Sequence, residues 1–150
     1  MVQTERRSDP NPVSISRMMG DAFAALDAYT RRHGLQCCGP PRAIYTAWGE
    51  PGVDVTVAVP IAEPATEPGP DGDVHAAMIA QRRALRFTHH GPYDALPRTC
   101  DAITEWLQAN GRMRSPDDWT KFMPMWEEYL TDPATTPPSD MVTNVYLPVD

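Results

Sequence analysis

Two parts of this sequence share one pattern, and that repetition is the strongest limit on how the chain can fold. Each part contains a helical stripe of apolar residues closed by a glycine, and the stripes stand at a constant offset of 77 positions, as from Gly34 to Gly111. The matching residues are Phe23, Leu26, Tyr29 and Gly34 in the first stripe and Cys100, Ile103, Trp106 and Gly111 in the second. We therefore expect two similar halves.

Each helical stripe is followed by a pair of strand-like segments, and the two pairs end alike. Residues 57–61 read Val-Ala-Val-Pro-Ile and residues 145–149 read Val-Tyr-Leu-Pro-Val, at an offset of 88 positions. The larger offset places an insertion, which contains Trp119 and Phe122, between the helix and the strands of the second half. Each half is predicted to be a (β)αββ repeat, a unit that cannot bury the face of its sheet alone.

The sequence thus predicts an α+β fold in which tandem (β)αββ repeats form an antiparallel sheet with the helices on one face. A ligand cleft is expected on the pseudo-twofold axis, because pockets favour the interface between structural units. We interpret the chain as a single domain, with repeat one at about 1–61, a proline-rich linker at 62–80 and repeat two at about 81–150.

The individual elements are predicted from periodicity and from turn residues. They are, in order, a short edge strand at 2–7, a helix from Ser14 that ends before Gly34, strands at 43–48, 53–61 and 83–90, a helix capped by Asp94 and ended by Asn110 and Gly111, a strand around Glu127, and a strand at 141–149. Trp106 is assigned to the core beside the stripe of the second helix.

The segment 126–133 (Trp-Glu-Glu-Tyr-Leu-Thr-Asp-Pro) contains the residues that most suggest a function. On a strand, Met125, Glu127 and Tyr129 share one face, so that one of the two adjacent glutamates points inward among large apolar groups. A buried carboxylate without a partner is costly, and a protein tends to keep one to meet a cation or to move a proton. The pattern alone leaves open whether Glu127 or Glu128 is the inward group.

Composition excludes several classes of function. The net charge of −7 argues against a phosphate-binding surface, so no direct nucleic-acid partner is expected. No apolar run is long enough to cross a bilayer, and the polar N-terminus has no apolar stretch of the kind found in secretion signals. Cys37, Cys38 and Cys100 form no regular framework, and together these features predict a cytoplasmic protein with no membrane partner. Adjacent strand residues His89 and His90 point apart and lack a third ligand, so neither a metal nor a cofactor is predicted.

Four segments resemble the GyrI-like small-molecule-binding domains, the effector-binding domains of AraC-type and multidrug-responsive transcription regulators. They are His-Gly-Pro-Tyr at 90–93, Trp-Leu-Gln-Ala-Asn-Gly at 106–111, Glu-x-Tyr-Leu-x-Asp-Pro at 127–133 and Thr-x-x-Tyr-Leu-Pro-Val at 143–149. The first repeat lacks a His-Gly-Pro-Tyr counterpart, because residues 8–16 read Ser-Asp-Pro-Asn-Pro-Val-Ser-Ile-Ser. No helix-turn-helix is expected in 150 residues of this kind, so the resemblance is to a stand-alone member.

The resemblance implies an aromatic-walled cavity with a glutamate inside it, which binds bulky and often cationic aromatic compounds. The family's glutamate falls on Glu127, its neighbouring tyrosine on Tyr129, and the aromatic strand of the first repeat on Tyr45. The predicted wall comprises Tyr45, Phe87, Trp119, Phe122, Met123 and Tyr129. Methionine suits a pocket that accepts ligands of varied shape.

Two functions of different classes follow. The first is the binding of bulky hydrophobic, preferably cationic aromatic small molecules. The second, implied by stand-alone relatives, is hydrolysis of strained cyclopropane-bearing genotoxins, with Glu127 as acid/base and Tyr129 or Tyr45 as hydrogen-bond donor. A protein partner, such as a DNA enzyme inhibited by this chain, or a homodimer is also compatible with the family resemblance.

Overall fold

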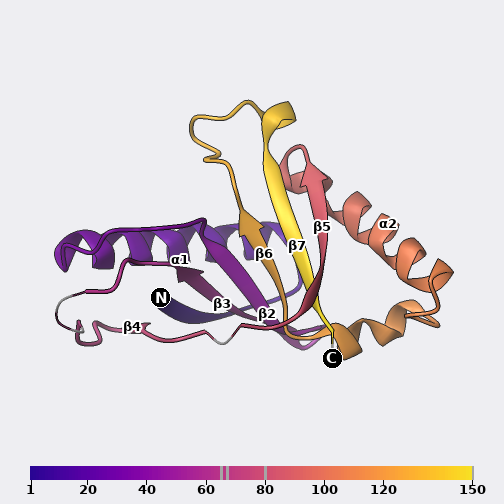
Figure 1. Ribbon diagram of the computed structural model, residues 1–150, viewed down its shortest axis with the longest axis horizontal. Helices are drawn as coiled ribbons and strands as arrows, with labels where there is room; N and C mark the ends of the chain where they lie inside the picture. Colours follow the sequence, from indigo (N-terminus) through magenta and orange to yellow (C-terminus); the bar gives the residue numbers. More distant parts are fainter. Residues whose placement is uncertain (65, 67, 80, 150) are drawn as a thin grey trace. The chain divides into compact units, whose positions relative to one another are not determined.

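The computed structural model describes residues 1–64, 66, 68–79 and 81–149, and the chain divides into two compact units, Met1–Gln81 and Arg82–Asp150. The first unit contains β1 (Val2–Ser8), α1 (Pro12–Arg32), β2 (Arg42–Gly49), β3 (Gly52–Val59) and β4 (Val74–Ala76) (Figure 1). The second contains β5 (Ala84–His90), the 3₁₀ turn η1 (Tyr93–Ala95), α2 (Leu96–Ala109), η2 (Pro116–Phe122), β6 (Met125–Tyr129), η3 (Pro138–Asp140) and β7 (Val142–Pro148). Each unit is described separately.

The predicted α+β fold with antiparallel strands is confirmed. The strand order is β4-β1-β3-β2 in the first unit and β6-β7-β5 in the second, and every neighbouring pair within a unit is antiparallel. In both units a strand, a helix and two further strands follow one another, and the last of these strands lies between the other two. The internal duplication and the cleft between the halves remain predictions.

The first unit buries an apolar face of its strands under α1. Valines alternate along β3 as the sequence pattern predicts, and Val53, Val55 and Val57 are all buried. The helix begins at Asn11, whose side-chain oxygen accepts the backbone N–H of Val13 at 2.9 Å. It ends before Gly34, which has a φ of 63° and so takes the left-handed conformation that glycine adopts without strain.

The N-terminal strand differs from its prediction as a short edge strand. β1 pairs with β3 on one side and with β4 on the other, so it is an interior strand of its unit. Charged residues obscured its alternation in the sequence: Arg6 shares a face with the buried Thr4, but its guanidinium reaches Asp73 at 3.3 Å. β4 lies within the segment predicted as linker, of which residues 65, 67 and 80 fall outside the described residues.

Two predictions about the second helix are wrong. Asp94 lies in η1, and the N-cap position of α2 is Ala95 with no side-chain hydrogen bond. Pro97, in the first turn, has no N–H to offer a capping side chain, which removes one of the usual cap partners. Trp106 is 42% exposed and not in the core, because it lies beside the buried stripe; its ring packs edge-on against Phe87 at 5.5 Å.

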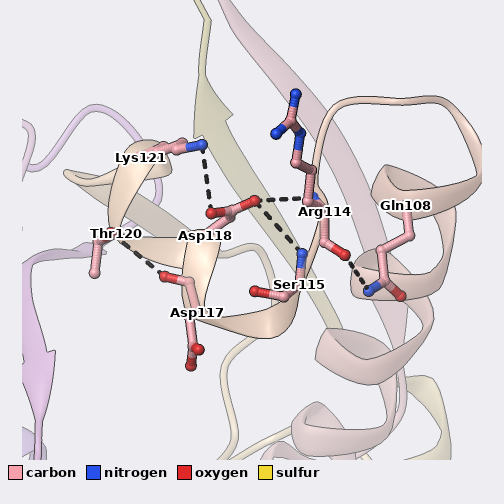
Figure 2. A network of polar contacts seen from close by, with 7 residues as sticks. All are labelled: Gln108, Arg114, Ser115, Asp117, Asp118, Thr120 and Lys121. Carbon is pink, nitrogen blue, oxygen red and sulfur yellow. Dashed lines mark hydrogen bonds and ion pairs between the residues drawn. The ribbon is translucent and has the colours of Figure 1, made fainter.

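The insertion that precedes β6 is organised by one carboxylate. Asp118 accepts the backbone N–H groups of Arg114 and Ser115, at 2.8 and 3.5 Å, and its second oxygen lies 3.3 Å from the ammonium group of Lys121 (Figure 2). The Arg114 hydrogen bond is the main cause that lowers the pKa of Asp118, so the carboxylate stays charged at neutral pH. These contacts fix η2, which carries Trp119 and Phe122.

Candidate functional site

Glu127 lies on β6, on the face of the second unit that α2 covers. Its strand neighbour on β7 is Val145, whose neighbour on β5 is Phe87, and directly paired residues on antiparallel strands point to the same side. Phe87 contacts Trp106 of α2, which identifies this side as the helix-covered face. Glu127 is 7% exposed, so its carboxyl group is buried as predicted.

A tyrosine two residues along β6 supports this buried carboxylate. The hydroxyl group of Tyr129 donates a hydrogen bond to Oε2 of Glu127 at 2.7 Å, which is a usual length for an O–H···O hydrogen bond. Glu128 points to the opposite face, where it is half-buried and accepts a longer hydrogen bond of 3.2 Å from Tyr146. The choice that the sequence pattern left open is thus decided by burial in favour of Glu127.

The charge of Glu127 acts on two residues that sequence analysis did not assign to the site. Burial, the charge of Glu127 and then that of Asp101 raise the pKa of the Cys100 thiol from 9.0 to about 11. Tyr93 meets Tyr129 edge-on with ring centroids 5.4 Å apart, and its pKa is raised by burial, by Asp132 and by Glu127. Tyr93 was recognisable as part of the His-Gly-Pro-Tyr motif, whereas Cys100 appeared only as one residue of an apolar stripe.

His89 lies in the same cross-strand row as Tyr129, on the same face and one row beyond Glu127. The sheet pairs His89 with Thr143 and Thr143 with Tyr129. The imidazole of His89 is buried, its Nε2 lies 3.0 Å from the carbonyl oxygen of Pro92 and its Nδ1 lies 2.5 Å from the hydroxyl oxygen of Thr99 on α2. A carbonyl can only accept, so Nε2 carries a proton, and the contact of Nδ1 with Thr99 links β5 to α2.

The remaining predicted wall residues of the second unit lie at the other end of α2. Trp119 donates its Nε1 hydrogen to the Thr104 hydroxyl at 2.9 Å, and its ring meets Phe122 edge-on at 6.4 Å. Phe122 is buried and Met123 is half-buried, directly before a cis Met123–Pro124 peptide bond. Their described contacts are with α2 and with each other, and their part in a ligand site remains a prediction.

Tyr45 belongs to the first unit. It is buried, and its ring lies 5.5 Å from that of Trp48, which is 52% exposed near the end of β2. Two open pockets of about 560 and 270 Å³ also lie in this unit, and neither is lined by a predicted site residue. The larger lies beside the loop that follows α1, and the smaller lies along α1 between Phe23 and Thr30. Both pockets are lined by residues of the first unit, and Glu127 is not among them.

The described residues contain neither a grouping of metal ligands nor a helix suited to span a membrane. Within the described part of the chain, no three His, Cys, Asp or Glu side chains are grouped closely enough to hold a metal ion. His89 is buried and His90 is exposed, so the two adjacent imidazoles do point apart. No helix among the described residues combines the length and the apolar character required to span a bilayer.

Comparison with known proteins identifies the class of this domain. The family model of the GyrI-like small molecule binding domain matches residues 12–150, which is most of the chain. The chain therefore belongs to the GyrI-like family of small-molecule-binding domains, and the resemblance seen in the sequence is confirmed. A search of curated proteins gave no significant match.

Solved structures of low sequence identity share the fold. The crystal structure of the EcmrR C-terminal domain has a TM-score of 0.73 at 17% identity, with 99% of this chain and 90% of that chain covered. The cryo-electron microscopy structure of EcmrR bound to DNA has a TM-score of 0.72 at 16% identity, with 99% of this chain and 53% of that chain covered. The crystal structure of a hydrolase from Listeria innocua has a TM-score of 0.57 at 16% identity, with 99% of this chain and 86% of that chain covered.

Proposed function

We propose that this domain binds bulky hydrophobic, preferably cationic aromatic small molecules, and that Glu127 is the counter-charge of the bound ligand. The observation that carries the proposal is a glutamate residue that is only 7% exposed and accepts a hydrogen bond of 2.7 Å from Tyr129 on the helix-covered face of its sheet. Burial disfavours the charged carboxylate, and a cation placed beside it would recover the lost free energy.

The aromatic residues near Glu127 favour a planar cation with delocalised charge. Tyr129 lies beside the carboxylate and Phe87 lies in its cross-strand row. Each aromatic face would add about 0.5–2 kcal/mol of cation–π attraction. Small cations that hold their water strongly would lose too much hydration in this site. Tyr45, Trp119, Phe122 and Met123 are proposed as further wall residues.

Membership in a family of small-molecule-binding domains supports this function, and the fold shared with EcmrR suggests how binding could be used. EcmrR has been solved in complex with DNA, and its C-terminal domain has the fold of this chain. By analogy, the present domain would pass on ligand binding through a protein partner or a homodimer. We propose no direct contact with nucleic acid, in keeping with the net charge of −7.

Titration with rhodamine 6G, a planar aromatic cation, tests the electrostatic part of the proposal. We expect Glu127→Gln to raise Kd by about 10- to 100-fold, since each 1.4 kcal/mol corresponds to a factor of about ten. Glu128→Gln is the matched control, because it removes the neighbouring carboxylate on the opposite face, and it should change Kd by less than about threefold. Equal affinities of wild type and Glu127→Gln would contradict the proposal.

A second candidate is hydrolysis of strained cyclopropane-bearing DNA alkylators. It is favoured by the paired Glu127 and Tyr129 side chains, which together offer an acid/base group and a hydrogen-bond donor, and by the fold shared with a hydrolase from Listeria innocua. Glu127 would take a proton from a water molecule while the oxygen of that water forms a bond to a carbon of the cyclopropane ring. The strained C–C bond of the ring would break at the same time, and Glu127 would pass the proton to the ring carbon that leaves.

Mass spectrometry distinguishes the two candidates. Hydrolysis adds the mass of one water to a cyclopropanoid substrate over repeated turnovers, and the Glu127→Ala variant should not produce this product. Stoichiometric binding without a hydrated product would exclude the hydrolase and leave the binding function in place.

A further inference from the structure

Exposure falls stepwise along a line of contacting side chains in the second unit. Tyr93 is 36% exposed, Tyr129 is half-buried, and Glu127 is 7% exposed. The rings of Tyr93 and Tyr129 meet edge-on at 5.4 Å, and the Tyr129 hydroxyl reaches the Glu127 carboxylate at 2.7 Å. This line connects solvent to the buried acid through two aromatic side chains.

The backbone that immediately precedes Tyr93 is held by two hydrogen bonds. Gly91 has a φ of 126°, a conformation that side chains rarely allow, and its N–H donates to the carbonyl oxygen of Met141 at 2.8 Å. The next carbonyl, that of Pro92, accepts the hydrogen of His89 Nε2. The exposed ring of Tyr93 can therefore change rotamer while the turn that bears it stays in place.

A second acid lies in the loop that follows β6. Asp132 lies in the turn directly after β6, and its side chain accepts the backbone N–H of Ala134 at 2.9 Å. Asp132 is exposed, and its charge acts on Tyr93 together with that of Glu127. The Tyr93 ring thus lies within reach of two negative charges, one in solvent and one buried.

We propose that Tyr93 is the gate through which organic cations reach Glu127, and that Asp132 attracts them to it. A planar cation would first be concentrated near Asp132, then displace the Tyr93 ring from Tyr129, and finally reach the carboxylate of Glu127. This inference rests on the proposed binding function and adds the route and the residues that control its rate.

The route separates the roles of three residues in time. Glu127 contacts the ligand only after the ligand has entered the site, so loss of its carboxylate should mainly raise the dissociation rate constant. Asp132 acts before contact, so its loss should slow association and only at low ionic strength, where exposed charges are poorly screened. Tyr93 blocks passage in both directions, so the size of its side chain should change association and dissociation together.

Stopped-flow fluorescence with rhodamine 6G tests the gate. Tyr93→Ala should raise both rate constants by about three- to tenfold and Tyr93→Trp should lower both, whereas Tyr93→Phe should resemble wild type. Asp132→Asn should lower the association rate constant by about two- to fivefold at low salt and leave it unchanged at high salt. Tyr146→Ala is the control and should leave both rate constants unchanged. It removes a tyrosine that stacks on Trp126, on the face of the sheet opposite to Glu127.

The outcomes distinguish the gate from the function on which it depends. If rhodamine 6G binds in a Glu127-dependent way but the rates do not follow side-chain size at position 93, the gate is wrong and the binding function stands. If the wild-type chain does not bind the dye at all, both proposals are wrong. Thermal melting of each variant identifies any that is unfolded, and the Tyr93→Trp and Asp132→Asn variants provide independent readings if Tyr93→Ala fails to fold.

Discussion

Both units contain a strand, a helix and two further strands in that order, and they differ at one central position of these strands. When β3 and β7 are aligned through their Val-x-x-Pro endings, Val57 matches Val145. The partner of Val57 on β2 is Ala43, and the partner of Val145 on β6 is Glu127. A buried alanine in the first unit thus occupies the place that a buried carboxylate occupies in the second.

The residues two positions further along β2 and β6 can be compared in the same way. Tyr45 in the first unit matches Tyr129 in the second, so each unit has a tyrosine two residues after this position. Buried polar residues are nevertheless distributed unequally among the described residues: the first unit has Thr4 and Thr30, and the second has His89, Glu127, Thr143 and Asn144. The comparison suggests that the first unit is mainly an apolar scaffold and that the second supplies the chemistry.

The largest expected effect comes from placing a glutamate in the first unit, at the position that corresponds to Glu127. Ala43 is fully buried, so Ala43→Glu would add both volume and a desolvated charge. We expect a loss of about 3–5 kcal/mol in the free energy of unfolding at neutral pH, the sum of overpacking and of a poorly compensated polar group. Urea denaturation followed by far-UV circular dichroism measures this loss.

Ala43→Met is the control for volume and should cost less than Ala43→Glu, because it adds no charge. The difference between the two variants should shrink as the pH falls, because protonation removes the buried charge. If Ala43→Glu is as stable as Ala43→Met at neutral pH, the first unit accepts a buried acid as readily as the second, and the proposed division of roles is wrong.

The Cys100 thiol provides an intermediate effect that reports on the buried charge itself. Its folded pKa of about 11 exceeds the ordinary 9.0, so the neutral thiol stabilises the fold fully below pH 9 and this contribution is lost as the pH rises toward 11. The shift corresponds to about 2–3 kcal/mol. Alkylation of Cys100 by iodoacetamide, measured against pH in a chain with Cys37→Ser and Cys38→Ser, gives the thiol pKa directly.

Glu127→Gln should lower the pKa of Cys100, because it removes the negative charge that disfavours the thiolate. Asp101→Asn is the matched control. Asp101 raises the pKa of Cys100 less than Glu127 does, so its replacement should lower that pKa by a smaller amount. An unchanged alkylation profile in Glu127→Gln would mean that residue 127 carries no charge or lies too far away to act on the thiol.

The sequence allowed the elements around Glu127 to be predicted because each signal there was local. Alternation along β6 and β3, the proline and glycine turns and the helical stripes all depend on near neighbours. β1 was poorly predicted because Arg6 places a charged group on a buried face and satisfies it with the distant Asp73. Cys100 was missed as a site residue for the same reason, since only the tertiary fold brings the thiol under the influence of the Glu127 charge.

The smallest expected effect compares the hydrogen bonds on the two faces of β6. Tyr129→Phe removes the 2.7 Å bond to the buried Glu127, and we expect a loss of about 1–2 kcal/mol in the free energy of unfolding. Tyr146→Phe removes the 3.2 Å bond to the half-buried Glu128 and should cost about 0.5–1 kcal/mol, since water can replace the lost partner there. Both variants keep the aromatic ring, so packing is matched. Equal losses in urea denaturation would show that the two carboxylates experience the same environment, which would remove the physical reason for assigning the ligand's counter-charge to Glu127.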